Sequence, residues 1–195
     1  MNKPHRTILI FAAAAVLLFG GRVSFAQTPP PAEQRSYEAV LYVILGSDDA
    51  TAGGELPPKL GAVGKQIRDN FQFSSYRLLN TYLGRTADSG SLEYKSVSSF
   101  QNASLEPESP SFLEWQLARL SKDPNGKNFS FELFRFGARV PVKMSNDAGK
   151  PVVYESVGLT LNRFGLLEGM PTLIGTISLP KTTGTLFLVM SVRPA

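Results

Sequence analysis

The clearest pattern of apolar and polar positions lies between Leu56 and Leu83, where a short amphipathic helix is predicted to run into a strand. Pro57 and Pro58 open the helix, where a missing N–H costs nothing and a fixed φ is already helical. Spacings of three and four place these residues on one face: Leu60, Val63, Gly64, Ile67 and Phe71. Because so short a helix is marginal alone, this face is predicted to dock on a sheet, with Gly64 at the point of close contact.

From Phe73 the apolar period changes to two, through Tyr76, Leu78 and Tyr82, which predicts a strand. The prolines and the following pattern F-x-F-x-x-YRLL-x-T-x-L-x-R resemble a group of uncharacterised exported bacterial proteins that carry this helix and strand near the N-terminus. The resemblance implies export, and it carries no catalytic residue to this chain.

The strands before and after this segment are predicted from their apolar content and from the turns between them. Residues 37–46 form a nearly continuous apolar run, which predicts a strand buried on both faces at the centre of a sheet. Residues 84–90 are predicted to be a turn, so that the strand before it and a strand over 91–99 pair as a hairpin.

The segment Phe112–Leu120 fits two interpretations, because Leu113, Leu117 and Leu120 have helical spacing whereas Leu113, Trp115 and Leu117 alternate as in a strand. We favour a strand, since the turn residues 123–126 follow directly and residues 128–136 form a second strand.

A two-residue turn within 123–126 fixes the register of these two strands. Asp123 then faces Gly126, which places Glu114 opposite Arg135 and Trp115 opposite Phe134. A single bulge would instead place Trp115 opposite Arg135.

Two further antiparallel pairs complete the prediction, residues 139–144 with 152–163 and residues 171–179 with 184–192. The last strand is apolar on both faces, so we expect it inside the sheet beside residues 37–45. The closing stretch, EGMPTLIGTISLP followed by TLFLVMSVRP, is also similar to the last part of secretin outer-membrane proteins, where a G-x-P-x-L turn precedes a strand with a Pro-containing tail. The predicted fold is α+β, a largely antiparallel sheet of about eight or nine strands with one principal amphipathic helix.

Residues 1–26 have the features of a secretory signal peptide. Basic residues precede the apolar run Ile8–Phe19, and Ser24-Phe25-Ala26 offers small residues for cleavage before Gln27. The alternative is an uncleaved N-terminal anchor. Residues 27–36 are a proline-rich spacer, and residues 37–195 are predicted to form a single α+β domain. The expected location is periplasmic or otherwise exported, with no membrane span after cleavage.

Composition restricts the chemistry of the mature chain. Without the three basic residues of the signal, the 20 basic and 16 acidic residues leave a net charge of +1, which gives no electrostatic footprint for nucleic acid. The only histidine, His5, lies in the signal, and the chain has no cysteine. Nucleophiles activated by histidine, histidine bases and the usual zinc or copper ligand sets are therefore excluded.

The remaining candidates are carboxylates and aromatic side chains. Asp48, Asp49 and Glu55 could hold calcium, but their spacing fits no EF-hand loop, and a solvated loop is the favoured interpretation. Acids and bases alternate along predicted strands, which favours cross-strand ion pairs over catalysis: Glu93, Glu114, Glu132 and Glu155 with Arg77, Arg119, Arg135 and Arg163. The aromatic residues could form a carbohydrate or peptide platform, but core packing is favoured: Trp115 with Phe100, Phe112, Phe129, Phe131, Phe134 and Phe136.

We therefore assign no catalytic, cofactor-binding or metal-ligating residue and expect no cofactor. The favoured function is a non-enzymatic binding or assembly role in the cell envelope, with an envelope protein as the partner. Two alternatives stay open, a carboxylate-dependent hydrolase of envelope glycans and a small outer-membrane β-barrel. The apolar character of both faces of the last strand argues against the barrel, because a lumen-facing side should be polar.

Overall fold

A computed structural model describes residues 35–49, 53–98, 109–124, 126–142, 152–180 and 184–195. The predicted signal segment and nearly all of the proline-rich spacer lie outside the described residues. Residues Gln34–Ala195 form one compact unit.

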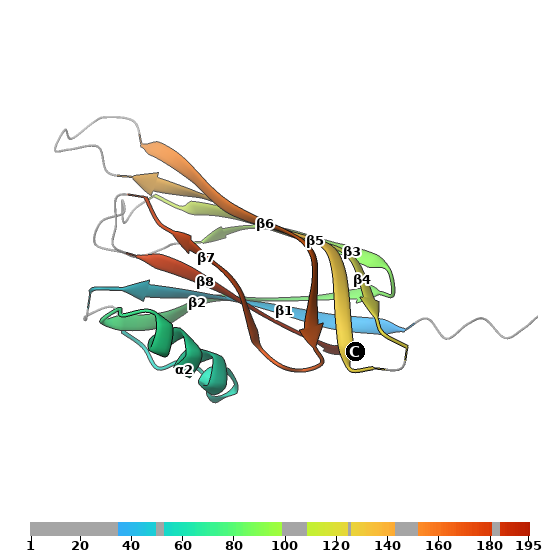
Figure 1. Cartoon of the computed structure of the whole chain (residues 1–195). Helices are drawn as coiled ribbons and strands as arrows, with labels where there is room; N and C mark the ends of the chain where they lie inside the picture. Colours follow the sequence, from blue (N-terminus) through green and yellow to red (C-terminus); the bar gives the residue numbers. More distant parts are fainter. Residues whose placement is uncertain (1–34, 50–52, 99–108, 125, 143–151, 181–183) are drawn as a thin grey trace, which may run out of the picture. The chain divides into compact units, whose positions relative to one another are not determined.

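The described residues contain eight strands, which form two antiparallel four-stranded sheets (Figure 1). Sheet A has the order β2 (Ser75–Ala87), β1 (Ser36–Ser47), β8 (Thr185–Pro194), β7 (Thr172–Ser178). Sheet B has the order β3 (Gly90–Ser98), β4 (Ser111–Lys122), β5 (Asn128–Val142), β6 (Val153–Leu167). The predicted α+β class with antiparallel strands and one principal helix is confirmed, whereas the division into two sheets was not specified by the sequence pattern.

Strand β1 lies between β2 and β8, as its two-sided apolar character predicted. One face of β1 contributes to the core between the sheets, and its other face packs under the helix. The prediction that the last strand lies inside the sheet beside β1 is also confirmed, because β8 pairs with both β1 and β7. The backbone N–H of Ala195 donates to the carbonyl of Ser36 at 3.0 Å.

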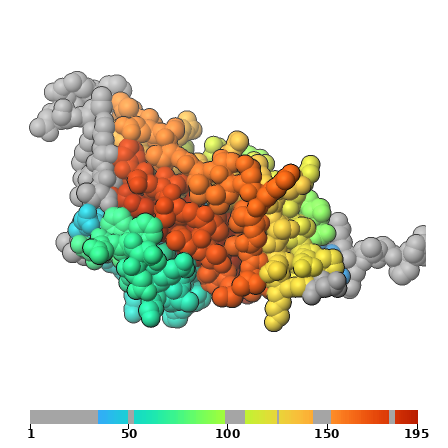
Figure 2. Space-filling model, viewed as in Figure 1, coloured from blue at the N-terminus to red at the C-terminus, as the bar shows by residue number. Residues whose placement is uncertain are grey.

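A 3-10 turn, η3 (Pro58–Leu60), leads into helix α2 (Gly61–Asn70). Leu60, Val63 and Ile67 are buried against the outer face of sheet A, which confirms the predicted docked face. Gly64 is also buried, but a β-carbon there would lie 3.1 Å from Leu56 Cδ1, so its close neighbour is the segment before the helix and not a strand. In Figure 2, β6 and β7 fill the middle of the visible face and α2 lies below them.

The core between the sheets is rich in aromatic side chains. Trp115 is 2% exposed, and the phenylalanines of β5 that face inward are equally buried: Phe129, Phe131, Phe134 and Phe136. Core packing is therefore confirmed for these residues, but it is wrong for Phe112, which lies on the outer face of sheet B and is 37% exposed. The predicted strand Phe112–Leu120 is confirmed as part of β4. Phe100 lies outside the described residues.

The predicted hairpin between residues 73–83 and 91–99 is wrong, because β2 and β3 belong to different sheets. Strand β2 continues to Ala87, where a short turn transfers the chain to sheet B. The N–H of Asp88 donates to the Arg35 carbonyl at 3.0 Å, and the N–H of Ser89 donates to the Leu120 carbonyl at 2.7 Å. Arg35 directly precedes β1 of sheet A, whereas Leu120 lies in β4 of sheet B. The chain therefore passes from sheet A to sheet B between Asp88 and Ser89.

The predicted register of β4 and β5 is also wrong. Trp115 lies opposite Phe136, and Glu114 lies opposite Gly137. The connection is longer than two residues, since the N–H of Asp123 donates to the carbonyl of Asn128 at 3.0 Å. A shift of two residues still pairs the same faces of the two strands, because side chains alternate with a period of two.

The last predicted pairs are correct in partner but not in every boundary. Residues 128–136 and the described part of 139–144 form one strand, β5, instead of two. Strand β5 pairs with β6, and β7 pairs with β8.

Candidate functional site

The outer face of sheet B carries a row of residues that lie abreast on its four strands. Strand pairing places Lys95 opposite Glu114, Glu114 opposite Gly137, and Gly137 opposite Gly158. The two adjacent glycines occupy the β5 and β6 end of this row, which therefore has no side chains of its own there. Glycine within a strand often marks a place where another backbone or a ligand approaches closely.

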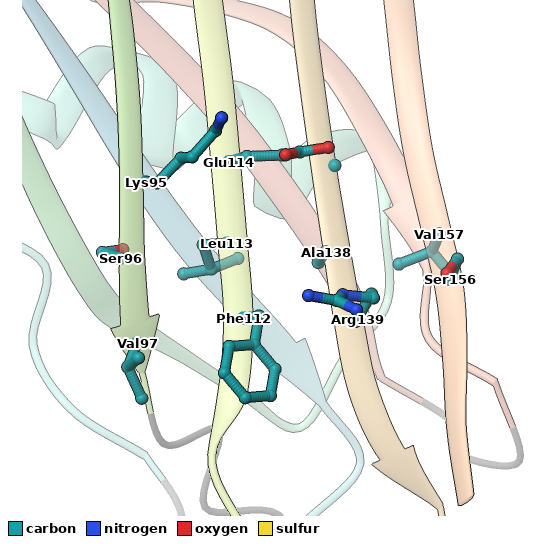
Figure 3. Close-up of a pocket in the computed structure, with 11 residues that line it drawn as sticks. Lys95, Ser96, Val97, Phe112, Leu113, Glu114, Ala138, Arg139, Ser156 and Val157 are labelled. Atoms are coloured by element: carbon teal, nitrogen blue, oxygen red, sulfur yellow. The ribbon is translucent and has the colours of Figure 1, made fainter.

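A hollow of about 520 Å³ lies over this row and the row next to it, and we call it the glycine groove. Its lining includes Lys95, Phe112, Glu114, Gly137 and Arg139 (Figure 3). In Figure 3 the Glu114 side chain extends from β4 toward β5. A β-carbon at Gly137 would lie 3.3 Å from Glu114 Cγ, so the glycine makes room for the carboxylate.

The two rows beside the glycines carry arginines on β5. Arg139 lies opposite Phe112, and its guanidinium carbon lies 5.1 Å from the Phe112 ring centroid. Arg135 lies opposite Gln116 on the other side of Gly137. Neither arginine forms an ion pair with any of the described residues. The groove therefore has an unneutralised guanidinium on each side of its floor.

Exposed apolar side chains adjoin the groove where β3 ends and β4 begins. Val97 is 63% exposed, and it lies opposite Phe112, which is 37% exposed. The ring of Phe112 lies 5.6 Å from that of Tyr154, which is also exposed. Aromatic and arginine side chains are the residue types enriched at the energetic centres of protein interfaces.

A smaller hollow of about 130 Å³ continues from the groove and brings together Glu93, Lys95, Glu114 and Arg135. Lys95 Nζ lies 2.8 Å from Glu93 Oε1. The hydrogen bond from Lys95 lowers the pKa of Glu93, and the same bond raises the pKa of Lys95. A glycosidase acid needs a raised pKa, so Glu93 is not suited to that role.

The other carboxylates from the sequence do not join this site. Glu132 pairs with Arg119 across β4 and β5 at 2.9 Å, which confirms the interpretation of cross-strand pairing for this pair. Asp48 and Asp49 follow β1, and Glu55 precedes η3. Among the described residues, no group of three or more acidic or histidine side chains could hold a metal ion.

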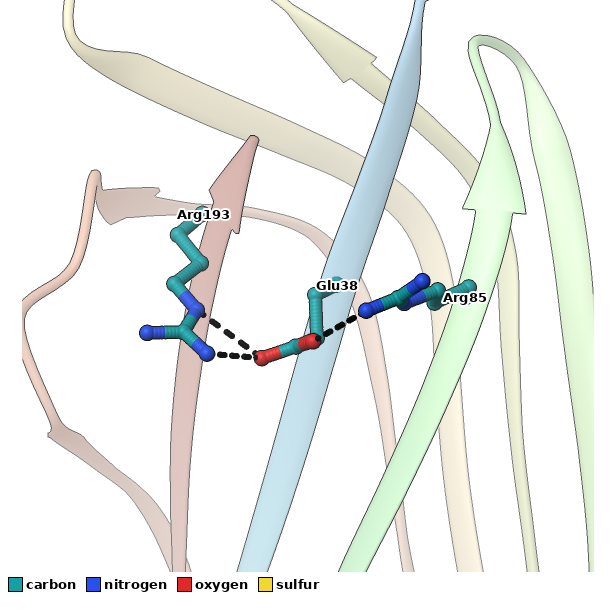
Figure 4. Close-up of polar contacts among 3 residues, drawn as sticks. All are labelled: Glu38, Arg85 and Arg193. Atoms are coloured by element: carbon teal, nitrogen blue, oxygen red, sulfur yellow. Dashed lines mark hydrogen bonds and ion pairs between the residues drawn. The ribbon is translucent and has the colours of Figure 1, made fainter. Parts of the chain in front are cut away.

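Sequence reasoning missed a buried carboxylate on the outer face of sheet A. Glu38 is 4% exposed and lies between Arg85 on β2 and Arg193 on β8 (Figure 4). Arg193 Nε donates to Glu38 Oε1 at 2.8 Å, and Arg85 Nη2 donates to Oε2 at 3.4 Å. The hydrogen bond from Arg193 lowers the pKa of Glu38, although burial acts in the opposite direction. With all its acceptor oxygens occupied, Glu38 joins three strands and is not a catalytic candidate.

The groove was also missed, although Gly137 and Gly158 interrupt the run of side chains on one face of two predicted strands. That interruption was the available signal. The alignment of the two glycines could not be predicted without the register of β5 and β6.

Comparisons with known proteins identify no family for this chain. No family model matches, and no curated protein matches. Among solved structures, the chain is similar to the Salmonella SPI-1 type III secretion injectisome secretin InvG, residues 176 to the end, in the open gate state. The TM-score is 0.40 with 10% identity, and the similarity covers 97% of this chain and 66% of the secretin chain.

At this TM-score, neither the fold nor the function of the secretin is carried over. Within the described residues, no helix combines the length and apolar character required to cross a membrane.

Proposed function

We propose that this chain is an exported, non-enzymatic binding or assembly protein of the bacterial cell envelope, and that it holds a segment of an envelope protein in the glycine groove. The signal segment supports export to the periplasm or beyond, with cleavage before Gln27. The observation that carries the binding role is Gly137 in the lining of the groove, between Arg135 and Arg139 on β5 and opposite Gly158 on β6.

The partner is an extended protein segment with acidic side chains. Glycine at positions 137 and 158 keeps this part of the sheet low apart from the Glu114 side chain, which allows a second backbone to approach closely. Arg135 and Arg139 are four strand residues apart, which corresponds to about 13 Å between their Cα atoms. Carboxylates on a bound segment could therefore engage one guanidinium on each side of Gly137. Planar guanidinium groups bind carboxylates in a bidentate geometry.

The exposed apolar residues beside the groove add contact area for the same segment. Val97, Phe112 and Tyr154 would bury an apolar side chain of the partner, and Phe112 is already stacked under Arg139. An apolar centre with a polar margin is the usual arrangement of protein interfaces. The exposed aliphatic side chain of Val97 offers a glycan neither a hydrogen bond nor an aromatic ring for stacking.

Site-specific photo-crosslinking in the source bacterium tests this proposal. A photoreactive residue at Val97 or Ser156, both at the groove, should give the same discrete adduct with one envelope protein. The same residue at Leu83 or Met170, which are 54% exposed and lie outside the groove lining, should give no such adduct. Substituting Arg139→Glu should reduce the adduct formed from Val97, because it reverses the charge offered to the acidic segment.

The proposal would be contradicted by adducts of equal yield at all four positions, or by an adduct that Arg139→Glu leaves unchanged. Release of reducing sugars from purified envelope glycan by the mature protein, lost in Glu114→Gln, would support the hydrolase alternative instead.

A further inference from the structure

A second hollow, of about 920 Å³, lies elsewhere on the outer face of sheet B. We call it the arginine hollow, and its polar lining comes from all four strands or their connections: Ser89, Arg119, Ser121, Ser130, Glu132 and Arg163. It shares no lining residue with the glycine groove.

Backbone strain is concentrated at this hollow. Ser89, Arg119 and Arg163 have φ values of 58°, 52° and 53°, and they are the non-glycine residues with positive φ among those described. All three line the arginine hollow. Residues other than glycine adopt this conformation at a cost in free energy, and such residues cluster at functional sites.

The strain has an identifiable geometric effect, because regular alternation is interrupted in three neighbouring strands at the same level. Inward-facing residues are separated by three positions instead of two, which appears as the pairs Leu117/Leu120, Phe131/Phe134 and Leu161/Phe164. Figure 1 shows β5 and β6 bending along their length. The pairing register is the same on both sides of the interruptions, so their effect is to re-aim side chains.

The re-aimed side chains are Arg119, Glu132 and Arg163. Strict alternation from Leu117, Phe134 and Leu161 would point each of them into the core. Instead all three are exposed and lie abreast, because the regular pairs on both sides place Arg119 across from Glu132 and Glu132 across from Arg163. If the interruptions served only to bend the sheet, charged residues would not be needed at these three positions.

The lining offers three kinds of polar group. Arg119 Nη1 lies 2.9 Å from Glu132 Oε2, whereas Arg163 forms no ion pair with any described residue. The hydroxyl groups of Ser121 and Ser130 are hydrogen-bonded to each other at 2.8 Å. Guanidinium groups only donate, an ionised carboxylate only accepts, and hydroxyls do both. A ligand with one negative charge and several hydroxyls matches this set.

We propose that the arginine hollow binds an acidic sugar, with the sugar carboxylate on Arg163 and the sugar hydroxyls on Glu132 and the serines. Two arginines and one glutamate leave the charged lining with a surplus of one positive charge, which suits a monocarboxylate. The volume lies within the usual range for small-molecule sites, about 300–1,000 Å³. This site is independent of the glycine groove, so either proposal can fail without the other.

Titration of the mature protein with glucuronate, followed by NMR chemical shifts, tests the proposal. Saturable shifts are expected in residues around Arg163 and Glu132. Glucose, which lacks the carboxylate, should bind at least tenfold more weakly, and so should inorganic phosphate, which lacks the sugar hydroxyls. Equal binding of glucose or of phosphate, or no saturation by glucuronate, would overturn the proposal.

Two variants separate binding from folding. Arg163→Gly should weaken glucuronate binding at least tenfold and yet raise the thermal midpoint, because glycine adopts positive φ freely. Leu83→Gly, at an exposed position of β2, should lower the midpoint and leave glucuronate binding unchanged. Unchanged glucuronate affinity in Arg163→Gly would refute the role of Arg163, and a lowered midpoint in that variant would refute the strain on which the site is argued.

Discussion

Substituting Ile67→Ala tests how strongly helix α2 is docked on sheet A. Ile67 is 0% exposed and belongs to the apolar cluster formed by α2, β1, β2 and β8. Isoleucine has three more carbon atoms than alanine, and at about 0.8 kcal/mol per buried methylene the loss of transfer free energy is about 2.4 kcal/mol. The cavity that remains adds to this loss, so the free energy of unfolding should fall by about 3–4 kcal/mol.

Denaturant unfolding and thermal unfolding measure this loss. For a domain of this size, about 2–4 °C of midpoint shift is expected per kcal/mol, so the midpoint should fall by about 6–16 °C. Lys65→Ala, on the exposed face of the same helix, is the matched control and should change stability by less than about 0.5 kcal/mol. Equal midpoints for the two variants would show that the helix is not held by the Ile67 face.

The remaining predictions concern an ion pair, two glycines and the last strand. The pKa of Glu38 is lowered in the fold, so its ionised form stabilises the fold above the ordinary pKa of 4.5, and this stability is lost as pH falls through the lowered pKa. In denaturant titrations, Glu38→Gln should therefore be more destabilising at pH 7 than at pH 3. An equal effect at both pH values would contradict the lowered pKa. Gly61→Ala should stabilise the fold by about 0.5–1 kcal/mol, because nothing lies within 4 Å of an added β-carbon. Gly158→Ala should be destabilising, because its β-carbon would lie 2.7 Å from a backbone carbonyl oxygen of β5, and equal unfolding midpoints for the two glycine variants would contradict this packing. Deleting residues 184–195 removes β8 from between β1 and β7 and should give an aggregated or unfolded product in size-exclusion chromatography, whereas a monomer with cooperative unfolding would contradict the central place of β8.

The strands and the helix could be predicted because their apolar periods depend on local sequence. The two-sided apolar runs of β1 and β8 identified the centre of sheet A, and the spacing of Leu60, Val63 and Ile67 identified the docked face of α2. These features depend on burial, which alternation records directly.

The division into two sheets could not be predicted in the same way. A strand followed by a short turn and another strand is compatible with a hairpin, and only the bonds of Asp88 and Ser89 to different neighbours show that the chain changes sheets. Similarly, the length of the connection after Asp123 determined the β4–β5 register, and the turn residues did not reveal that length.

The candidate sites escaped prediction for a related reason. The spacing from Leu117 to Leu120 suggested a helix, but it records the interrupted alternation that turns Arg119 outward. The same spacing occurs in β5 and β6. The three interruptions form one site only because strand pairing places them at the same level of the sheet, and this pairing could not be predicted from the sequence. The glycine groove likewise depends on Gly137 and Gly158 being neighbours across two strands.

The affinity of the cross-linked partner for groove variants tests the proposed binding surface most directly. In Gly137→Val the new side chain would occupy the groove floor, and its nearest contact is the flexible Glu114 side chain, so the fold should be retained. The control is Thr160→Val, because Thr160 lies on β6 at the same outer face of sheet B as Gly137 but outside the groove lining. Calorimetry with the purified partner should show a dissociation constant raised at least tenfold, about 1.4 kcal/mol, for Gly137→Val and within about twofold of the original for Thr160→Val. An unchanged dissociation constant in a folded Gly137→Val protein would contradict binding in the glycine groove.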